Sequence, residues 1–208
     1  MKQRGWRRVA KRAFDVVAAG TALAAASPVM GGVAGAIWLT MGRPVLFTQD
    51  RVGQGDRVFR VMKFRTMKVA APGAPPEQDH LRITRLGAFL RASSLDELPQ
   101  LWNVVVGDMS LVGPRPLLVR YLPRYSPRQR RRHDVLPGLT GWAQVNGRNT
   151  LSWDEKFERD VWYVEHWSLA LDARIVAKTV LQVLRRQGIS AEGHATMPEF
   201  QGAASEAA

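Results

Sequence analysis

The longest apolar stretch of the chain runs from Val16 to Gly42 and contains no charged side chain. A straight helix of this length would reach about 40 Å at ~1.5 Å per residue, more than the ~30 Å hydrocarbon core of a bilayer. Ser27-Pro28 lies near its middle, and proline inside a helix lacks the N–H that would bond the carbonyl four residues earlier. The pattern therefore predicts a membrane-associated helix that is bent and broken at Ser27-Pro28.

Basic residues flank this stretch on both sides. Residues 1–12 contain six bases and no acid, and further bases follow between Arg43 and Lys68. A spanning helix usually shows a difference in positive charge between its two flanks. Because both flanks are positive, we expect both to stay cytoplasmic, which makes the stretch a re-entrant hairpin.

Three other interpretations compete with the re-entrant hairpin. Arg7-Arg8 before an apolar run resembles a twin-arginine or secretory signal, although Asp15 interrupts the start of that run. A transmembrane helix kinked at Pro28 fits the length, and a buried helical hairpin fits the many alanines and glycines. The charge on both flanks makes the re-entrant hairpin the preferred prediction.

The rest of the chain alternates short strand patterns with helical ones. Residues 43–49 and 56–65 predict a small β-hairpin joined by Gly53-Gln54-Gly55. The expected helices are a short one through 91, then 95–106, an arginine-rich helix from Ser126-Pro127 to Pro137, a capped helix from Ser152 to about 166, and 169–186. We therefore expect an α+β, mainly helical, monotopic membrane protein with three parts: a basic N-terminus and membrane helix (1–42), a catalytic domain (43–188) and a tail (189–208).

Composition narrows the possible partners. The chain has 208 residues, 30 Lys and Arg against 18 Asp and Glu, a formal charge of +12 and no cysteine, which excludes disulfides and thiolate chemistry. Residues 1–12 and 120–132 each hold six bases and no acid, so these two stretches account for the whole excess. Such stretches favour an anionic partner, either an anionic membrane leaflet or a nucleic acid.

Two adjacent carboxylates, Asp96 and Glu97, are the first candidates for chemistry. They lie in Ser94-Leu95-Asp96-Glu97-Leu98-Pro99, where Pro99 suits the first turn of a helix. The simpler interpretation is a capping box, in which the acids only stabilise the helix start. Nearby Arg91, and Arg115 between two prolines, instead suggest phosphate recognition beside the acids.

A third candidate is the run from Pro137 to Asn149, in which turn residues alternate with a short strand. It fits a backbone nest for an anion, with Arg148 at its tip. Together these features favour a carboxylate that works among phosphates. An aspartate can attack phosphorus to form an acyl phosphate, and a neighbouring glutamate can hold Mg²⁺.

At this point the sequence resembles a known family, the bacterial sugar transferases of the small monotopic phosphoglycosyl transferase type. Eight stretches in the family's order carry the resemblance, which covers about residues 11–186. They are Lys11-Arg12-x-x-Asp15, the apolar segment broken at Ser27-Pro28, Gln49-x-Arg51-x-Gly53, Lys63-Phe64-Arg65-Thr66-Met67, Ser94 to Leu101, Met109 to Pro116, Pro137 to Asn149, and Asp160 to Asp172.

The resemblance implies transfer of a sugar 1-phosphate from a UDP-sugar to a polyprenol phosphate such as undecaprenyl phosphate, with release of UMP, at the start of glycoconjugate assembly. It implies that Asp96 is the nucleophile of a covalent aspartyl-phosphosugar intermediate and that Glu97 binds Mg²⁺. It also implies a location at the cytoplasmic face of the bacterial inner membrane, with no nucleic-acid partner. The implied substrate and phosphate-binding residues are Lys63, Arg65, Arg91, Arg115, Arg148 and Asp160, and the membrane hairpin residues are Lys11, Arg12, Asp15, Ser27 and Pro28.

The competing hypothesis is a non-catalytic protein, either a basic membrane-bound adaptor or a nucleic-acid binder. In that case Asp96 and Glu97 only cap a helix. Release of UMP from a UDP-sugar in the presence of polyprenol phosphate separates the two hypotheses. The transferred sugar and the oligomeric state do not follow from the sequence.

Overall fold

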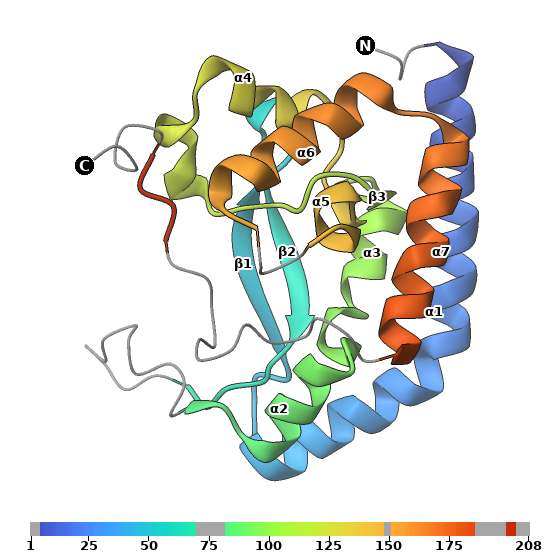
Figure 1. Cartoon of the computed structure of the whole chain (residues 1–208). Helices are drawn as coiled ribbons and strands as arrows, with labels where there is room; N and C mark the ends of the chain where they lie inside the picture. Colours follow the sequence, from blue (N-terminus) through green and yellow to red (C-terminus); the bar gives the residue numbers. More distant parts are fainter. Residues whose placement is uncertain (1–4, 70–81, 148–150, 186–198, 203–208) are drawn as a thin grey trace.

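The computed structural model describes residues 5–69, 82–147, 151–185 and 199–202, and within them the chain is mostly helical (Figure 1). A long helix, α1 (Trp6–Met41), bounds one side and bends beneath the body, and α7 (Leu169–Arg185) lies beside its first half. The other elements, in chain order, are β1 (Leu46–Val52), η1 (Gln54–Asp56), β2 (Val58–Phe64), α2 (Arg85–Ala92), η3 (Leu95–Glu97), α3 (Gln100–Val106), β3 (Ser110–Val112), η4 (Val119–Arg124), α4 (Pro127–Arg130), η5 (Arg131–Asp134), β4 (Gly138–Thr140), α5 (Trp142–Val145), α6 (Trp153–His166) and α7 (Leu169–Arg185). The predicted α+β, mainly helical class is confirmed.

Helix α1 (Trp6–Met41) changes direction partway along its length, as Figure 1 shows. The expected bend is present, but the expected break is not, because the backbone stays helical through Ser27 and Pro28. The proline leaves the carbonyl of Ala24 without its backbone donor, and the Ser27 hydroxyl donates to that oxygen at 2.8 Å. The serine thus satisfies the freed carbonyl and allows the helix to continue across the proline.

Most of α1 is apolar and exposed. It is long and apolar enough to cross a membrane, and only 11% of its most apolar 18-residue window is buried. The buried positions lie where the helix contacts the body: Ala19 packs with Leu101, Val104 and Met109. Ile37, near the other end of α1, packs in a separate cluster with Phe64 and Leu90. One side of α1 therefore belongs to the core of the protein, and the other side is uncovered.

The predicted β-hairpin is confirmed, with shifted bounds. Strands β1 and β2 are antiparallel, with Leu46 opposite Phe64 and Val52 opposite Val58. The first strand begins three residues later than expected, after the Arg43–Pro44 pair, and extends to Val52. A second, two-stranded sheet is formed by β3 and β4, which are parallel.

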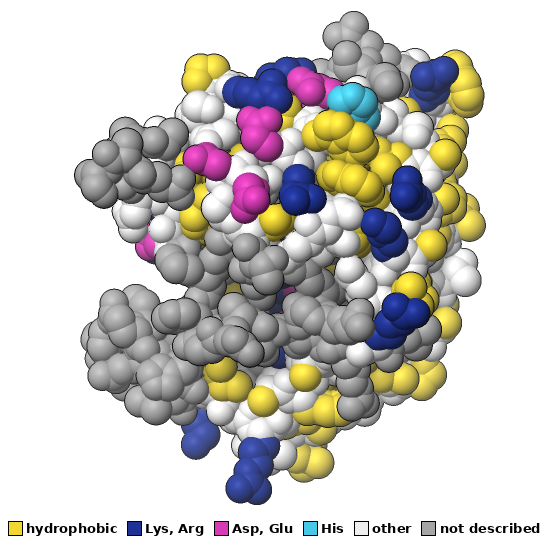
Figure 2. All heavy atoms as spheres, viewed as in Figure 1, with side chains coloured by type: hydrophobic (Ala, Val, Ile, Leu, Met, Phe, Trp, Pro, Cys, Tyr) yellow, Lys and Arg dark blue, Asp and Glu magenta, His cyan; other side chains and the backbone are white. Residues whose placement is uncertain are grey.

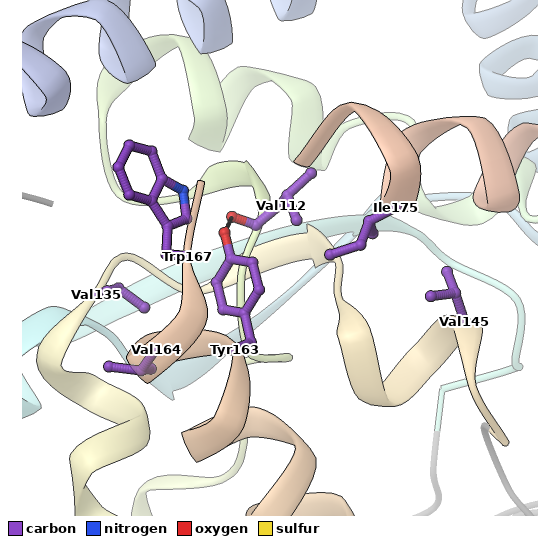
Figure 3. Packing of buried hydrophobic residues seen from close by; sticks show 7 residues of the cluster. All are labelled: Val112, Val135, Val145, Tyr163, Val164, Trp167 and Ile175. Carbon is purple, nitrogen blue, oxygen red and sulfur yellow. Dashed lines mark hydrogen bonds between the residues drawn. The ribbon is translucent and has the colours of Figure 1, made fainter. Parts of the chain in front are cut away.

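The main core cluster lies between α6, α7 and the short second sheet (Figure 3). Tyr163 of α6 points into it, and its hydroxyl lies within hydrogen-bond distance of two acceptors, the Val112 carbonyl at 3.0 Å and Asp172 Oδ1 at 2.8 Å. Ser152 and Glu155 form the predicted capping box at the start of α6. The cluster contains Val112, Val135, Val145, Tyr163, Val164, Trp167 and Ile175.

Part of the C-terminal tail is packed against the body. Phe200 is buried in an aromatic cluster with Tyr121, Tyr125, Trp153 and Phe157. Arg124 donates to the Phe200 carbonyl and pairs with Glu199 at 2.8 Å. The sequence pattern gave no sign of this contact, because one aromatic residue in a polar tail has no periodicity.

Candidate active site

The Asp96–Glu97 pair lies in the short turn η3, between α2 and α3. Ser94 adopts a left-handed backbone conformation with φ 58°, and its side chain makes no cap hydrogen bond. Helix α3 begins after Pro99, two residues beyond the acids, instead of at Leu95 as expected. The capping-box interpretation is therefore wrong, and it does not account for either carboxylate.

Glu97 binds two cations from distant parts of the chain. Its Oε1 accepts a hydrogen bond from Lys63 Nζ at 2.6 Å and another from Arg115 Nη2 at 2.6 Å. Burial alone would raise the pKa of Glu97, but the Arg115 guanidinium and the Lys63 ammonium outweigh burial and hold the pKa far below its ordinary value. Glu97 is therefore a fixed negative charge.

The same contacts act on the two cations. Attraction to Glu97 raises the pKa of Arg115. Burial lowers the pKa of Lys63, and the nearby Glu97 offsets only part of that effect. Lys63 is the penultimate residue of β2, and Arg115 lies three residues after the end of β3, so the two sheets bring these side chains to η3.

Asp96 is buried beside this cluster, and no described residue makes a hydrogen bond to its carboxylate. Burial and the charge of Glu97 raise its pKa, while Lys63, Arg115 and Arg91 act in the opposite direction. Of the two neighbouring acids, Glu97 is bound by Lys63 and Arg115, whereas the Asp96 carboxylate is available to react with a substrate. Such an arrangement lets one carboxylate attack an electrophile while nearby cations attract its phosphate oxygens.

Arg91 is positioned from α2. Its Nε donates to the Thr66 hydroxyl at 2.9 Å, and its Nη2 contacts the Met67 sulfur at 3.1 Å. Gly87, four residues earlier, lets α2 approach this segment closely, because a Cβ there would lie 1.8 Å from the Thr66 carbonyl oxygen. The close packing of α2 on Thr66 therefore fixes the position of Arg91 relative to Asp96.

The loop that carries Arg115 is held from behind by Arg132, which the sequence analysis did not single out. Arg132 Nη2 donates to the Arg115 carbonyl at 2.7 Å and pairs with Asp160 Oδ2 at 2.7 Å. Arg132 and Asp160 are both buried. Asp160, which was expected to bind phosphate, instead pairs with Arg132 in the structure. Only its neighbours in the fold reveal the role of Arg132, since in sequence it is one of six similar arginines.

Arg65, also expected at the phosphate site, binds backbone carbonyls. Its guanidinium donates to the carbonyls of Met41 at 2.6 Å, Gly42 at 2.7 Å and Arg43 at 3.1 Å. These oxygens lie at and just after the C-terminal end of α1, where helical carbonyls lack partners. The structure therefore assigns Arg65 to the junction between α1 and the body. Arg148 lies outside the described residues.

The three charged residues expected in the membrane hairpin make contacts with the body. Lys11 is buried and pairs with Asp15 at 2.9 Å and with Asp172 of α7 at 2.7 Å. Arg12 donates to the carbonyls of Val104 and Val105 in α3. Lys11 and Arg12 are thus largely engaged by protein, which corrects the view that all six N-terminal bases face an anionic partner.

The second basic stretch is also paired within the fold. In Figure 2, acidic side chains lie among basic ones in the upper part of the visible face. Each of the six arginines in residues 120–132 has a carboxylate within 4.0 Å. The partners are Glu199 for Arg120 and Arg124, Glu158 for Arg128, Asp56 for Arg130, Glu165 for Arg131 and Asp160 for Arg132. These acids come from distant positions, and five carboxylates serve six arginines, so they offset most but not all of the positive charge of this stretch.

Comparisons with known proteins identify several relatives of this chain. The model of the bacterial sugar transferase family matches residues 6–186. "Uncharacterized sugar transferase EpsL" of Bacillus subtilis is 47% identical over 197 residues, covering 93% of this chain and 96% of the relative. The UDP-glucose:undecaprenyl-phosphate glucose-1-phosphate transferase of Escherichia coli is 42% identical over 191 residues, covering 86% of this chain. A UDP-N-acetylgalactosamine-undecaprenyl-phosphate N-acetylgalactosaminephosphotransferase of Aeromonas hydrophila is 43% identical over 183 residues, covering 84% of this chain. The matches span 41% and 43% of the latter two relatives, so this chain corresponds to less than half of each.

Proposed function

The chain belongs to the bacterial sugar transferase family, and on that premise we propose that it transfers a sugar 1-phosphate from a UDP-sugar to a polyprenol phosphate and releases UMP. The names of the Escherichia coli and Aeromonas hydrophila relatives describe this reaction with glucose and N-acetylgalactosamine. The observation that carries the proposal is the available Asp96 carboxylate beside Glu97, which two cations hold.

In the first half-reaction, a carboxylate oxygen of Asp96 attacks the phosphorus that bears the sugar. The bond from that phosphorus to the oxygen bridging the two phosphates breaks, and UMP leaves with the electron pair. The product on the protein is an aspartyl phosphosugar. Arg115, Arg91 and Lys63 act on Asp96 electrostatically and suit the stabilisation of charge that develops on the phosphate oxygens.

In the second half-reaction, a phosphate oxygen of the polyprenol phosphate attacks the same phosphorus. The acyl phosphate bond breaks, the Asp96 carboxylate is restored, and polyprenol diphosphate sugar is released. The acceptor is a membrane lipid, so the site must lie close to a bilayer. One side of α1 packs on α3, just after the Asp96–Glu97 turn, and its other, apolar side is uncovered, which supports such a position.

A Mg²⁺ ion fits the residues present. Glu97 Oε2 and both oxygens of Asp96 make no hydrogen bond with described residues, whereas Glu97 Oε1 already has two. The described residues contain no group of three His, Asp or Glu side chains that could hold a metal by themselves. Mg²⁺ is commonly bound by one or two carboxylates plus substrate phosphates, so Glu97, with Asp96 beside it, would hold the ion together with the diphosphate. The bound ion would neutralise charge on the diphosphate and the leaving UMP.

We place the protein at the cytoplasmic face of the bacterial inner membrane, with α1 as a re-entrant hairpin. The bend of α1 is compatible with both of its ends lying on one side of the bilayer. At the far end of α1, Arg65 ties the helix to β2, and at the near end Lys11 ties it to α7. Because both ends are bound to the same body, a straight crossing with the two ends on opposite sides is disfavoured.

The test is the purified full chain incubated with a panel of UDP-sugars and Mg²⁺ in the absence of lipid. A covalent intermediate predicts a burst of about one UMP per site, and polyprenol phosphate then converts the burst into turnover. Asp96→Asn should remove both, while Asp50→Asn, an exposed carboxylate in β1, should leave both unchanged. Robust turnover without a burst would favour direct transfer to the lipid, and turnover by Asp96→Asn near the wild-type rate would refute the proposed nucleophile.

A further inference from the structure

A cavity of about 460 Å³ lies between the first turns of α1, the η1 turn and the C-terminal end of α3. It is lined by Val58 and Phe59 at the start of β2, whereas Lys63 lies near the other end of that strand. At ~3.3 Å per residue, the five positions from Val58 to Lys63 correspond to roughly 16 Å. The cavity is therefore a separate site from the Asp96–Glu97 cluster, none of whose residues line it.

The cavity wall has two arginines with no partner for their side chains among the described residues. Four cations and two carboxylates line it. Lys11 and Arg12 are bound to carboxylates or backbone carbonyls, Asp15 pairs with Lys11, and Asp108 accepts a hydrogen bond from Asn103. Arg8 and Arg57 are exposed and have neither an ion pair nor a side-chain hydrogen bond to any described residue. Their guanidinium groups therefore suit an anionic ligand, and phosphate oxygens match the planar donor fork of arginine.

The cavity also has an apolar margin. Val58 and Val106 line it and are 53% and 50% exposed, respectively. Trp102, half-exposed, lies one turn before Val106 on the same face of α3, and Val9 lies exposed next to Arg8. Inorganic phosphate gains nothing from such apolar side chains. A phospholipid can bind the arginines through its headgroup and the apolar side chains through its acyl chains. Exposed apolar patches of this kind mark interaction sites for membranes or other partners.

We propose that this cavity binds the phosphate headgroup of a membrane phospholipid, with Arg8 and Arg57 contacting the phosphate and Val58 and Val106 contacting the acyl chains. The bound lipid would be structural, since it lies away from Asp96. It would hold the first turns of α1 against the η1 turn. The inference assumes that the protein lies at a membrane and is independent of the covalent mechanism.

The experiment uses the full chain in neutral detergent, titrated with dioctanoyl phosphatidylglycerol while tryptophan fluorescence is recorded. The Arg8→Gln/Arg57→Gln variant should bind this lipid at least about tenfold more weakly than the wild type, since hydrogen bonds to charged groups are lost. The matched control is Arg7→Gln/Arg60→Gln, which removes the same charge at Arg7, next to Arg8 in α1, and at Arg60, in β2 three residues after Arg57. Neither residue lines the cavity. It should change binding less than about twofold.

Three results would overturn the inference. An equal loss of binding in the two double variants would mean that the lipid is attracted only by overall charge. No loss in either would mean that the cavity does not bind the headgroup, and inorganic phosphate binding as tightly as the lipid would make it a free-phosphate site. Asp96→Asn should bind the lipid like the wild type, so a failure of the proposed reaction leaves this test unaffected. Thermal unfolding of each variant checks that the exposed substitutions leave the fold intact.

Discussion

Asp160→Asn tests whether the buried Asp160–Arg132 ion pair positions Arg115, the arginine that binds Glu97. Asp160 and Arg132 are 4% and 2% exposed, and the guanidinium donates to Asp160 at 2.7 and 3.1 Å. Removing one partner of a buried pair costs about 3–5 kcal/mol, because the other charge stays buried without compensation. At about 2–4 °C per kcal/mol for a domain of this size, the midpoint of thermal unfolding should fall by about 6–20 °C.

A second variant separates stability from catalysis. In Asp160→Leu/Arg132→Met both charges are gone, and replacement of a buried pair by apolar groups is often close to neutral, so most of the unfolding midpoint should return. Activity should not return, because the Arg115 carbonyl has lost the donor that fixed its loop. Misplacement of a binding group by about 1 Å can cost about a hundredfold in rate, so we expect a kcat about a hundredfold below the wild type.

The control on the same helix is Glu158→Gln, which breaks the exposed pair with Arg128 and should cost less than about 1 kcal/mol. The assays are thermal unfolding followed by tryptophan fluorescence and UMP release at saturating UDP-sugar. If kcat recovers together with the unfolding midpoint in the double variant, Asp160 affects activity only through folding. The positioning of Arg115 by Arg132 would then be refuted.

Three further predictions address the site and α1. The attacking form of Asp96 is the carboxylate, and its pKa is raised, so kcat/KM should fall by about tenfold per pH unit on the acid side. The fall should start above the pH range in which an ordinary aspartate titrates. An acid limb at or below that range would contradict the buried nucleophile. Glu97→Gln leaves Lys63 and Arg115 unpaired, so activity should drop sharply. It also removes a charge that raises the pKa of Asp96, so the acid limb of any residual activity should move to lower pH. An unmoved limb would show that the two acids do not interact. Pro28→Ala restores a backbone donor in α1, so spin labels on cysteines near its two ends should move apart, and an unchanged distance would mean that packing on the body sets the bend.

Local patterns predicted the local structure well. The Ser152 capping box, the β-hairpin and the helical stretch 169–186 are signalled by residues only a few positions apart, and each is present, with α7 ending at Arg185. At 94–97 the same kind of local signal failed. The spacing of Ser94 and Glu97 is that of a capping box, but Glu97 instead binds cations 34 and 18 residues away.

The function of single charged side chains was harder to predict, because their partners are set by the tertiary fold. Lys63, Arg91, Arg115, Asp96 and Glu97 do come together, as the family motifs implied. Arg65, Asp160 and Lys11 belong to the same motifs, yet the structure places them on backbone carbonyls or on buried charges. Motif membership therefore did not distinguish the residues that come together around Asp96 and Glu97 from those that bind backbone carbonyls or buried charges, and the folded geometry did.

The buried contact between Lys11 and Asp172 bears on how the protein is made. Its two partners are separated by nearly the whole described chain, so a ribosome has released the helix that contains Lys11 long before Asp172 is synthesised. Until Val106 has been synthesised the apolar helix has neither α3 nor α7 to pack against, and afterwards it still lacks α7, so a bilayer is an environment that can shield it. With α1 in the proposed membrane position, its insertion should therefore precede folding of the body. A chain that lacked α1 would expose the apolar side chains that contact Ala19 and leave Asp172 without Lys11, so its removal should yield a misfolded protein instead of a soluble enzyme.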